Sequence, residues 1–329
     1  MSVPAPPLPR AIYLETTSRC NSLCETCILT FGGREPARDL TWAEFRRVVD
    51  QFPALDRAVL HGIGEPLLNR ELPRMIAHLK ARGAVVLFNS NAITLGPRQG
   101  AALIDAGLDE LRVSLDASTV ATYARVRGVD ALEKVLANLE RLAAAKRSAG
   151  VSHPRVSLWF TALRDNIDEI PGLVDLGVRV GAAGIYLQRL VYNGLGLATK
   201  EQSLHGQLQA REAELIRATE AAARAAGLDF SASGATAPEV SLAESRDDQP
   251  WSACRRPWTL VYVTVHGNVL PCCIAPWITE DYDGLILDNL YRQTLEEIWW
   301  GRGYSEFRRA IGTETPPEPC RGCGVKWSL

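Results

Sequence analysis

Short apolar runs alternate with amphipathic helical patterns along the first two hundred residues of the chain. Short apolar runs bounded by turn residues are typical of strands that are buried on both faces. We predict strands, in chain order, at residues 11–16, 57–62, 84–89, 110–116, 155–163 and 184–190. Helices are predicted between them, the first after Thr41, which has the capping-box partner Glu44 three residues later. This alternation predicts an α/β fold with a parallel sheet, either open or curved into a partial (β/α)6 barrel.

The pattern changes near residue 200. A helix rich in Ala and Glu is predicted at about 201–226, and the polar stretch at 239–250 reads as a linker. A hairpin follows, with its turn at 266–268, and a capped helix begins at Thr294. We therefore divide the chain into a tail (1–10), a barrel (11–198), a linking helix and linker (199–250) and a small C-terminal domain (251–329).

Composition narrows the class of protein. A chain of 329 residues with 47% hydrophobic content can bury a large core, as one big domain or two modest ones. The net charge of −2 gives no reason to expect nucleic acid as a partner. Because no signal-peptide pattern or membrane-length apolar run occurs, we expect a cytoplasmic protein. Eight cysteines in such a chain indicate metal ligands or reactive thiols rather than disulfides.

Three of these cysteines, Cys20, Cys24 and Cys27, follow the first predicted strand with the spacing CxxxCxxC. Three thiolates can each bind one iron of a cubane [4Fe-4S] cluster and leave the fourth iron open to a small molecule. A zinc site or incidental thiols are the alternatives. The spacing and its position resemble the radical S-adenosylmethionine (SAM) superfamily. The resemblance implies that the open iron chelates the amino and carboxylate groups of SAM, and that reductive cleavage of SAM gives a 5′-deoxyadenosyl radical.

Two later segments resemble further motifs of that superfamily. HGIGEP at 61–66 follows the second strand and resembles the GGEP motif, which implies that Gly62, Gly64 and Glu65 hold the SAM amino group. Glycine allows such close backbone approach to a ligand. NSNA follows the third strand and resembles the TNG segment, with Asn91 as the shared residue, although its neighbours differ from the family pattern.

SLDAS follows the fourth strand and resembles the family's SLDG segment. The resemblance implies contacts between SAM and Ser114 or Asp116, and Arg127 in the RVRG that follows would clamp the SAM carboxylate. Each of these polar residues could instead cap a helix. Thr26 stands where the superfamily often has an aromatic residue, so the usual adenine contact is not expected there.

The C-terminal cysteines form a second pattern. Cys254 is followed by Gly267, by Cys272 five positions later, and finally by a CxxC pair at 320–323. This pattern resembles the auxiliary-cluster pattern of the SPASM and twitch subfamilies. The resemblance implies that four thiolates complete a second [4Fe-4S] cluster, with a structural zinc as the alternative. The full SPASM pattern has seven cysteines and two clusters, so we expect the shorter twitch form with one. The four predicted ligands are Cys254, Cys272, Cys320 and Cys323.

A few residues remain as candidates for contacting a substrate. Cys273 is left over from the cluster pattern and could return a hydrogen atom to a substrate radical, or could simply be a small buried side chain. Arg189, at the end of the sixth strand, suits a carboxylate or a phosphate, or could form an ion pair within the barrel. Phe160 and Thr161 are expected to face the cavity, and His61 is expected to be a packing residue rather than a base.

The resemblance implies a radical SAM enzyme that is reduced by an electron donor of the flavodoxin or ferredoxin type. We expect a small polar substrate of antibiotic or other natural-product biosynthesis, such as a sugar, aminocyclitol or nucleoside, whose alcohol is oxidised to a ketone. The alternatives are decarboxylation of a nucleoside uronic acid held by Arg189, and epimerisation with Cys273 as hydrogen donor.

We favour a small polar substrate over a peptide, because only about ten residues precede the first predicted strand. Relatives that modify peptides often carry an added recognition domain. A non-enzymatic iron-sulfur electron carrier would account for two clusters but would not require Glu65 or the six-stranded scaffold.

Overall fold

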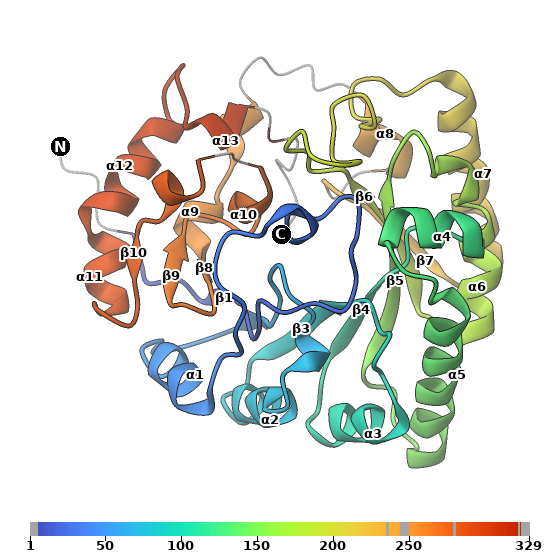
Figure 1. Cartoon of the computed structure of the whole chain (residues 1–329), viewed down its shortest axis with the longest axis horizontal. Helices are drawn as coiled ribbons and strands as arrows, with labels where there is room; N and C mark the ends of the chain where they lie inside the picture. Colours follow the sequence, from blue (N-terminus) through green and yellow to red (C-terminus); the bar gives the residue numbers. More distant parts are fainter. Residues whose placement is uncertain (1–5, 235–236, 244–249, 279–280, 322, 324–329) are drawn as a thin grey trace.

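A computed structural model of the chain describes residues 6–234, 237–243, 250–278, 281–321 and 323. The described strands form one ten-stranded sheet, in the order β10-β9-β8-β1-β2-β3-β4-β5-β6-β7. Figure 1 shows this sheet curving around a central space, with the helices on its outer side. The strands are β1 (Ala11–Leu14), β2 (Arg57–Val59), β3 (Val85–Ser90), β4 (Glu110–Ser114), β5 (Arg155–Ala162), β6 (Gly184–Arg189), β7 (Asp229–Ala232), β8 (Leu260–Val263), β9 (Asn268–Leu270) and β10 (Asp288–Asn289).

Strands β1 to β7 run parallel to one another, which confirms the predicted α/β fold. The strands predicted from the apolar runs are β1 to β6. The segment at 199–250, predicted as a linking helix and linker, also contributes β7, which pairs in parallel with β6. The helices of this part are α1 (Trp42–Val49), α2 (Leu72–Ala81), α3 (Pro97–Asp105), α4 (Val120–Arg127), α5 (Leu132–Ala149), α6 (Gly172–Val180) and α7 (Ala210–Ala225).

The C-terminal region continues the same sheet instead of standing beside it. Its first strand, β8, lies parallel to β1, with Ala11 opposite Leu260 and Leu14 opposite Val263. The predicted hairpin is confirmed, because β8 and β9 pair antiparallel around the turn. The remaining helices are α8 (Pro238–Leu242), α9 (Arg256–Thr259), α10 (Ala275–Ile278), α11 (Leu295–Trp300), α12 (Arg302–Ile311) and α13 (Glu318–Arg321).

The alternation of side chains along each strand separates an apolar outer face from a polar interior. On β5, Leu158 and Phe160 are buried in the hydrophobic core, whereas Ser157, Trp159 and Thr161 line the interior cavity. The prediction that Phe160 faces the cavity is therefore wrong, because it shares the parity of Leu158. The strands thus carry their polar side chains inward, where a ligand can meet them.

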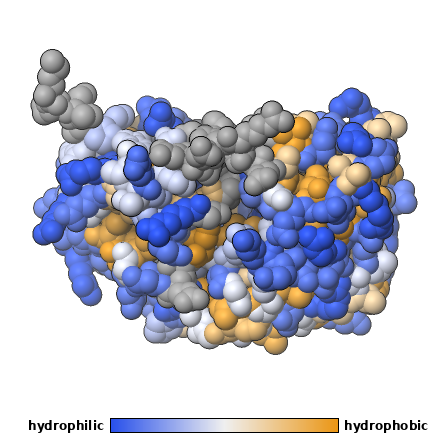
Figure 2. Space-filling view, turned by 90° about the horizontal axis from the view of Figure 1, so that it is seen from above, coloured by the Kyte–Doolittle hydropathy of each residue, from blue (hydrophilic) through white to orange (hydrophobic). Residues whose placement is uncertain are grey.

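The outer surface of the protein is mixed in character. In the space-filling view, hydrophilic side chains predominate and hydrophobic ones show in smaller patches between them (Figure 2). Among the described residues, no helix has both the length and the apolar character needed to cross a membrane.

Candidate functional site

A cavity of about 570 Å³ occupies the space enclosed by the curved sheet. Its lining combines loops that follow β1 to β4, inward residues of the strands, and part of the C-terminal region. Asp116 and the four cysteines of the second pattern are the predicted site residues that lie outside this lining. The structure brings the others together around it: Cys20, Cys24, Cys27, Gly62, Gly64, Glu65, Asn91, Ser114, Arg127, Arg189 and Cys273.

The loop that carries the first three cysteines is held by backbone contacts. The Cys27 N–H donates to the Cys24 carbonyl at 2.9 Å, and the Glu25 N–H donates to the Val126 carbonyl at the end of α4 at 3.0 Å. Gly128 follows α4 with φ +65°, and a Cβ there would lie 2.0 Å from the Leu23 carbonyl oxygen. The end of α4 is therefore packed directly on the cysteine loop, which fixes where the thiols point.

Burial raises the pKa of all three thiols, that of Cys27 to about 12. Iron binding has to displace these protons, because the thiolate is the metal ligand.

Glu65 braces two loops of the site. Its carboxylate is buried and accepts hydrogen bonds from the Leu67 N–H at 3.0 Å, the Ser90 hydroxyl at 2.8 Å and the Asn91 N–H at 2.7 Å. Burial raises the pKa of Glu65, against the lowering effect of these bonds. A carboxylate can accept about four hydrogen bonds, and three are already used. The predicted contact with the SAM amino group therefore has to be made by the remaining acceptor site of Glu65 or by the backbone of residues 62–64.

Asn91 connects the turn after β3 with the cysteine loop. Its side-chain amide donates to the Asn21 side chain at 2.7 Å and lies 3.9 Å from the Cys20 sulfur. The next residue, Ala92, has φ 56°, in the left-handed region that favours glycine. Glycine, which the TNG segment has at this position, adopts this conformation most easily. Here the buried Asn138 supports it by donating to the Ala92 carbonyl at 2.8 Å.

Asp116 and Arg127 form a buried ion pair at the edge of the cavity. Their closest atoms are 2.9 Å apart, and the Asp116 side chain is 2% exposed. Asp116 also accepts from the Thr161 N–H at 2.8 Å, so it holds β4 against β5. Although burial lowers the pKa of Arg127, its interactions with Cys24 and Asp116 raise it well above the ordinary value. A permanently cationic guanidinium therefore lies beside the first cysteines.

Arg189 also lines the cavity and is 9% exposed. Its Nε donates to the Ser241 carbonyl, and its backbone N–H donates to the Ser233 hydroxyl oxygen at 3.2 Å. Burial lowers the pKa of Arg189. Across the part of the chain that the structure describes, no carboxylate pairs with this guanidinium. The alternative of an ion pair within the barrel stays a prediction.

Stacked rings inside the barrel were missed at the sequence level. Trp159 and Tyr186 stack with ring centroids 4.0 Å apart, and the Arg112 guanidinium lies 4.5 Å from the Trp159 ring. All three line the cavity. The signal was period-two alternation within each strand, which puts these residues on the inward face with a polar or small neighbour. Arg112 shares this face with Ser114, Trp159 with Ser157, and Tyr186 with Gln188.

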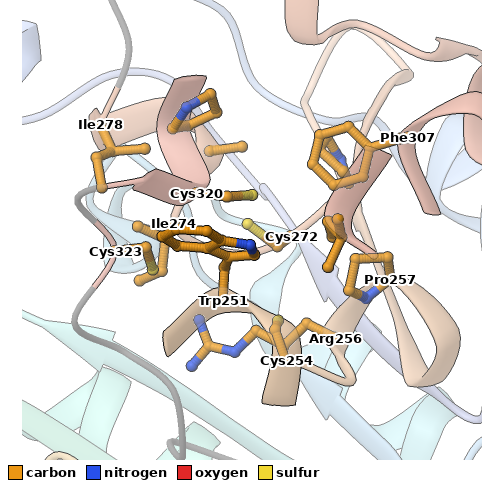
Figure 3. A pocket seen from close by; sticks show the side chains of 14 residues that line it. Trp251, Cys254, Arg256, Pro257, Cys272, Ile274, Ile278, Phe307, Cys320 and Cys323 are labelled. Atoms are coloured by element: carbon orange, nitrogen blue, oxygen red, sulfur yellow. The ribbon is translucent and has the colours of Figure 1, made fainter. Parts of the chain in front are cut away.

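A second, small pocket holds the other four predicted ligands. Cys254, Cys272, Cys320 and Cys323 line it together with apolar side chains such as those of Trp251, Ile274 and Phe307 (Figure 3). Cys273, by contrast, belongs to the lining of the central cavity. Arg256 is 6% exposed and lines both spaces.

The donor sets of the two sites fit iron-sulfur clusters. Among the described residues, no three His, Cys, Asp or Glu side chains converge tightly enough for a single metal ion. In a cubane each thiolate binds a different iron, so the three cysteines around the large cavity and the four around the small one are suitable in kind and number. Thiolates are the soft ligands that iron-sulfur clusters use, and zinc also binds them.

Comparisons with known proteins agree with both sites. Residues 14–175 match the Radical SAM superfamily, and residues 254–324 match an iron-sulfur cluster-binding domain, SPASM. A PqqA peptide cyclase of Xanthomonas campestris is 31% identical over 98% of this chain and 81% of its own length. One from Streptomyces rochei is 30% identical over 98% of this chain and 84% of its own length.

Solved structures show the same fold. SuiB of Streptococcus suis, bound to S-adenosylmethionine, superposes with a TM-score of 0.71 at 17% identity, covering 92% of this chain and 68% of that one. The AdoMet complex of anSMEcpe gives a TM-score of 0.64 at 14% identity, covering 92% of this chain and 84% of that one.

The relatives from Xanthomonas campestris and Streptomyces rochei are named as peptide cyclases. They therefore do not support the predicted likeness to twitch enzymes that act on sugars or nucleosides. The two matched domains imply one [4Fe-4S] cluster in each, with SAM as cofactor. The chain belongs to the radical SAM superfamily and, within it, to the enzymes that carry a C-terminal SPASM domain.

Proposed function

We propose that this radical SAM enzyme modifies a peptide by forming a bond within it, and that a carboxylate of the peptide binds Arg189 in the central cavity. The likeness over nearly the whole chain to proteins named PqqA peptide cyclases supports the peptide and the cyclisation. The Arg189 guanidinium, which no carboxylate of the described residues neutralises, supports the carboxylate and is the observation that carries the proposal.

A buried guanidinium without a counter-charge is unfavourable, because it has lost most of its hydration. Other arginines of the cavity have partners: Arg127 pairs with Asp116, and Arg155 pairs with Glu110 at 3.1 Å. Among the described residues, the Arg189 side chain has a backbone carbonyl, that of Ser241, as its hydrogen-bond partner and no carboxylate. A ligand carboxylate would supply the missing charge and could accept two parallel hydrogen bonds from the guanidinium.

We assign the cluster ligands to the same cysteines that the sequence predicts. Cys20, Cys24 and Cys27 hold the first cluster, and the four cysteines of the small pocket hold the auxiliary one. When bound, the first cluster and SAM supply a 5′-deoxyadenosyl radical that removes hydrogen from an unactivated carbon. The chain contributes the peptide groups of 62–64 for the SAM amino group and Arg127 for the SAM carboxylate. The enclosing barrel excludes water from the reacting carbon.

A second candidate is a small anionic substrate such as a uronic acid, which would lose its carboxyl group. The volume of the cavity favours it, because about 570 Å³ also has to hold SAM and leaves room that suits a small molecule. Cys273 lines the same cavity and is buried, which also keeps hydrogen return to a substrate radical as a variant of this candidate.

The test measures 5′-deoxyadenosine from anaerobically reconstituted protein with SAM and a strong reductant. Short acidic peptides, the same peptides with Gln and Asn in place of their acids, and uronic acids are compared. We expect the acidic peptides alone to stimulate turnover and to lose two hydrogens by mass. One hydrogen atom would pass to deoxyadenosine, and the other would leave as a proton and an electron that the auxiliary cluster would accept. Equal stimulation by neutral peptides would refute the role of the carboxylate, and release of carbon dioxide from a uronic acid would establish the second candidate.

The variant Arg189→Gln should lower kcat/KM for the acidic peptide by at least about thirtyfold, since a buried charge pair is worth 2–5 kcal/mol. The matched control is Arg155→Gln, which removes a cavity arginine that already has Glu110 and Asp229 as partners. It should change kcat/KM much less.

A further inference from the structure

Glu15 is a buried carboxylate that lies just behind the wall of the SAM site. It follows β1 directly and is 2% exposed. Its Oε1 accepts from the Ile63 N–H at 3.2 Å and from the Tyr262 hydroxyl, and its Oε2 accepts from the Val265 N–H at 3.3 Å. One side chain therefore joins the loop after β2 to the hairpin β8–β9.

The contact with the loop after β2 is very close. A Cβ on Gly62 would lie 2.0 Å from the Glu15 Cγ and 2.5 Å from its Oε1. The peptide between Gly62 and Ile63 thus lies directly against the carboxylate, and its N–H points at it. The carboxylate therefore sets the orientation of this peptide, within the segment that we assign to the SAM amino group.

The contact with the hairpin is equally direct. The Glu15 N–H donates to the Val263 carbonyl at 2.9 Å, as an extension of the β1–β8 ladder. Tyr262, which donates to the Glu15 side chain, also stacks on Tyr13 at a centroid distance of 6.4 Å. After β9 the same hairpin leads to Cys272 of the auxiliary pocket.

We propose that Glu15 is a positioning residue through which the hairpin β8–β9 sets the geometry of the SAM-binding loop. The inference rests on the proposed placement of SAM at Gly62–Gly64. Glu15 does not line the cavity and touches no reacting atom; it acts through the Gly62–Ile63 peptide. Removing its carboxylate weakens SAM binding while both clusters remain in place.

The chain offers a matched control in Glu35. This carboxylate accepts from the Asn268 side chain at 2.6 Å, the Tyr282 hydroxyl at 3.1 Å and the Thr264 hydroxyl at 3.2 Å. It therefore binds the same hairpin as Glu15 but approaches it from the loop after the first cysteines. No hydrogen bond joins Glu35 to the peptide groups of 62–64 among the residues the structure describes.

The experiment compares SAM binding by the reduced, fully loaded protein and its variants, measured as an anaerobic dissociation constant. The SAM-induced change in the electron paramagnetic resonance spectrum of the first cluster is the second readout. We expect Glu15→Ala to weaken binding about tenfold, the loss expected for one hydrogen bond. Glu15→Gln keeps one oxygen acceptor and should weaken binding less, and Glu35→Gln should stay within about twofold of wild type. Iron content should match wild type in all of them.

Tyr262→Phe is a second variant that does not depend on whether Glu15→Ala folds. It removes the hydroxyl that donates to the Glu15 carboxylate and leaves the Glu15 side chain in place. It should weaken SAM binding by a smaller factor than Glu15→Ala. Unchanged SAM affinity in Glu15→Gln and Tyr262→Phe, or an equal loss in Glu35→Gln, would overturn the inference. Wild-type protein with both clusters that binds no SAM would instead refute the SAM placement on which the inference rests.

Discussion

Replacing Gly64 by alanine probes how tightly the SAM-binding loop is packed on the segment before the first cysteines. A Cβ at this position would lie 2.1 Å from the Thr17 carbonyl oxygen and 2.8 Å from the Arg19 carbonyl oxygen. Both contacts are with backbone, so no side chain can rotate away. Because non-bonded contacts of carbon prefer about 3.5–4.0 Å, the two segments have to separate by more than about 1 Å.

The cost of this separation can be worked out from the contacts. Overpacking of one carbon in a well-packed site costs about 1–3 kcal/mol. The shift also breaks the hydrogen bond from the Glu65 N–H to the Arg19 carbonyl, which is 2.8 Å long and worth about 1 kcal/mol. We therefore expect Gly64→Ala to lose about 2–4 kcal/mol of stability and to displace Cys20 from its position for iron.

The assay is the thermal midpoint of anaerobically reconstituted protein, together with iron content and SAM affinity. Gly96→Ala is the matched control, because a Cβ there meets only the Thr94 carbonyl oxygen, at 3.9 Å, with ordinary backbone angles. Gly64→Ala should lower the midpoint by several degrees and reduce iron binding, whereas the control should do neither. A Gly64→Ala protein with the iron content and midpoint of the control would show that the two loops are not packed as described.

Three further predictions concern the supports of the site. Asp116→Asn leaves the Arg127 guanidinium without its counter-charge and should cost about 3–5 kcal/mol in unfolding measurements, whereas Asp165→Asn, in an exposed pair, should cost less than about 1 kcal/mol. Burial lowers the pKa of His61 from 6.5 to about 4, so the unfolded chain binds a proton between these values that the native protein does not. His61 should therefore contribute a fall of about 3 kcal/mol in the free energy of unfolding from pH 6.5 to pH 4, measured as the difference between wild type and His61→Phe. His205, whose pKa burial also lowers to about 4, is present in both proteins and cancels in this difference. Asn138→Leu leaves the buried Ile93 carbonyl without its donor, while the Ala92 carbonyl keeps the Leu95 N–H at 3.2 Å, so it should cost about 1–3 kcal/mol by denaturant titration.

The strands of the barrel could be predicted from the sequence because their apolar runs are buried against helices. Strand β7 could not, since Asp229–Ala232 is largely exposed and is held in the sheet by its ladder with β6. The position of Phe160 could have been read correctly, because period-two alternation places it with Leu158 rather than with Thr161. The prediction for Phe160 was wrong because it used only the position near the end of the strand and not the alternation of side chains along it.

The candidate site was predictable where spacing carries the chemistry, as for Cys20 and the cysteines after it. Partners of charged residues were not predictable, because a lone Arg189 at a strand end gives no information on which carboxylates the fold brings near it. Glu15 was missed for the same reason. In the sequence it is one acidic residue before a polar loop, and only the return of the chain at β8 buries it.

The attachment of the C-terminal strands has a practical consequence for anyone who divides this protein. Because β1 pairs with β2 on one side and β8 on the other, cutting the chain before β8 would turn β1 into a bare sheet edge. Unpaired edges invite association with other chains. A shortened protein that keeps the first cysteines but lacks residues 260–270 should therefore aggregate during expression. The barrel of this enzyme should be produced only together with its C-terminal region.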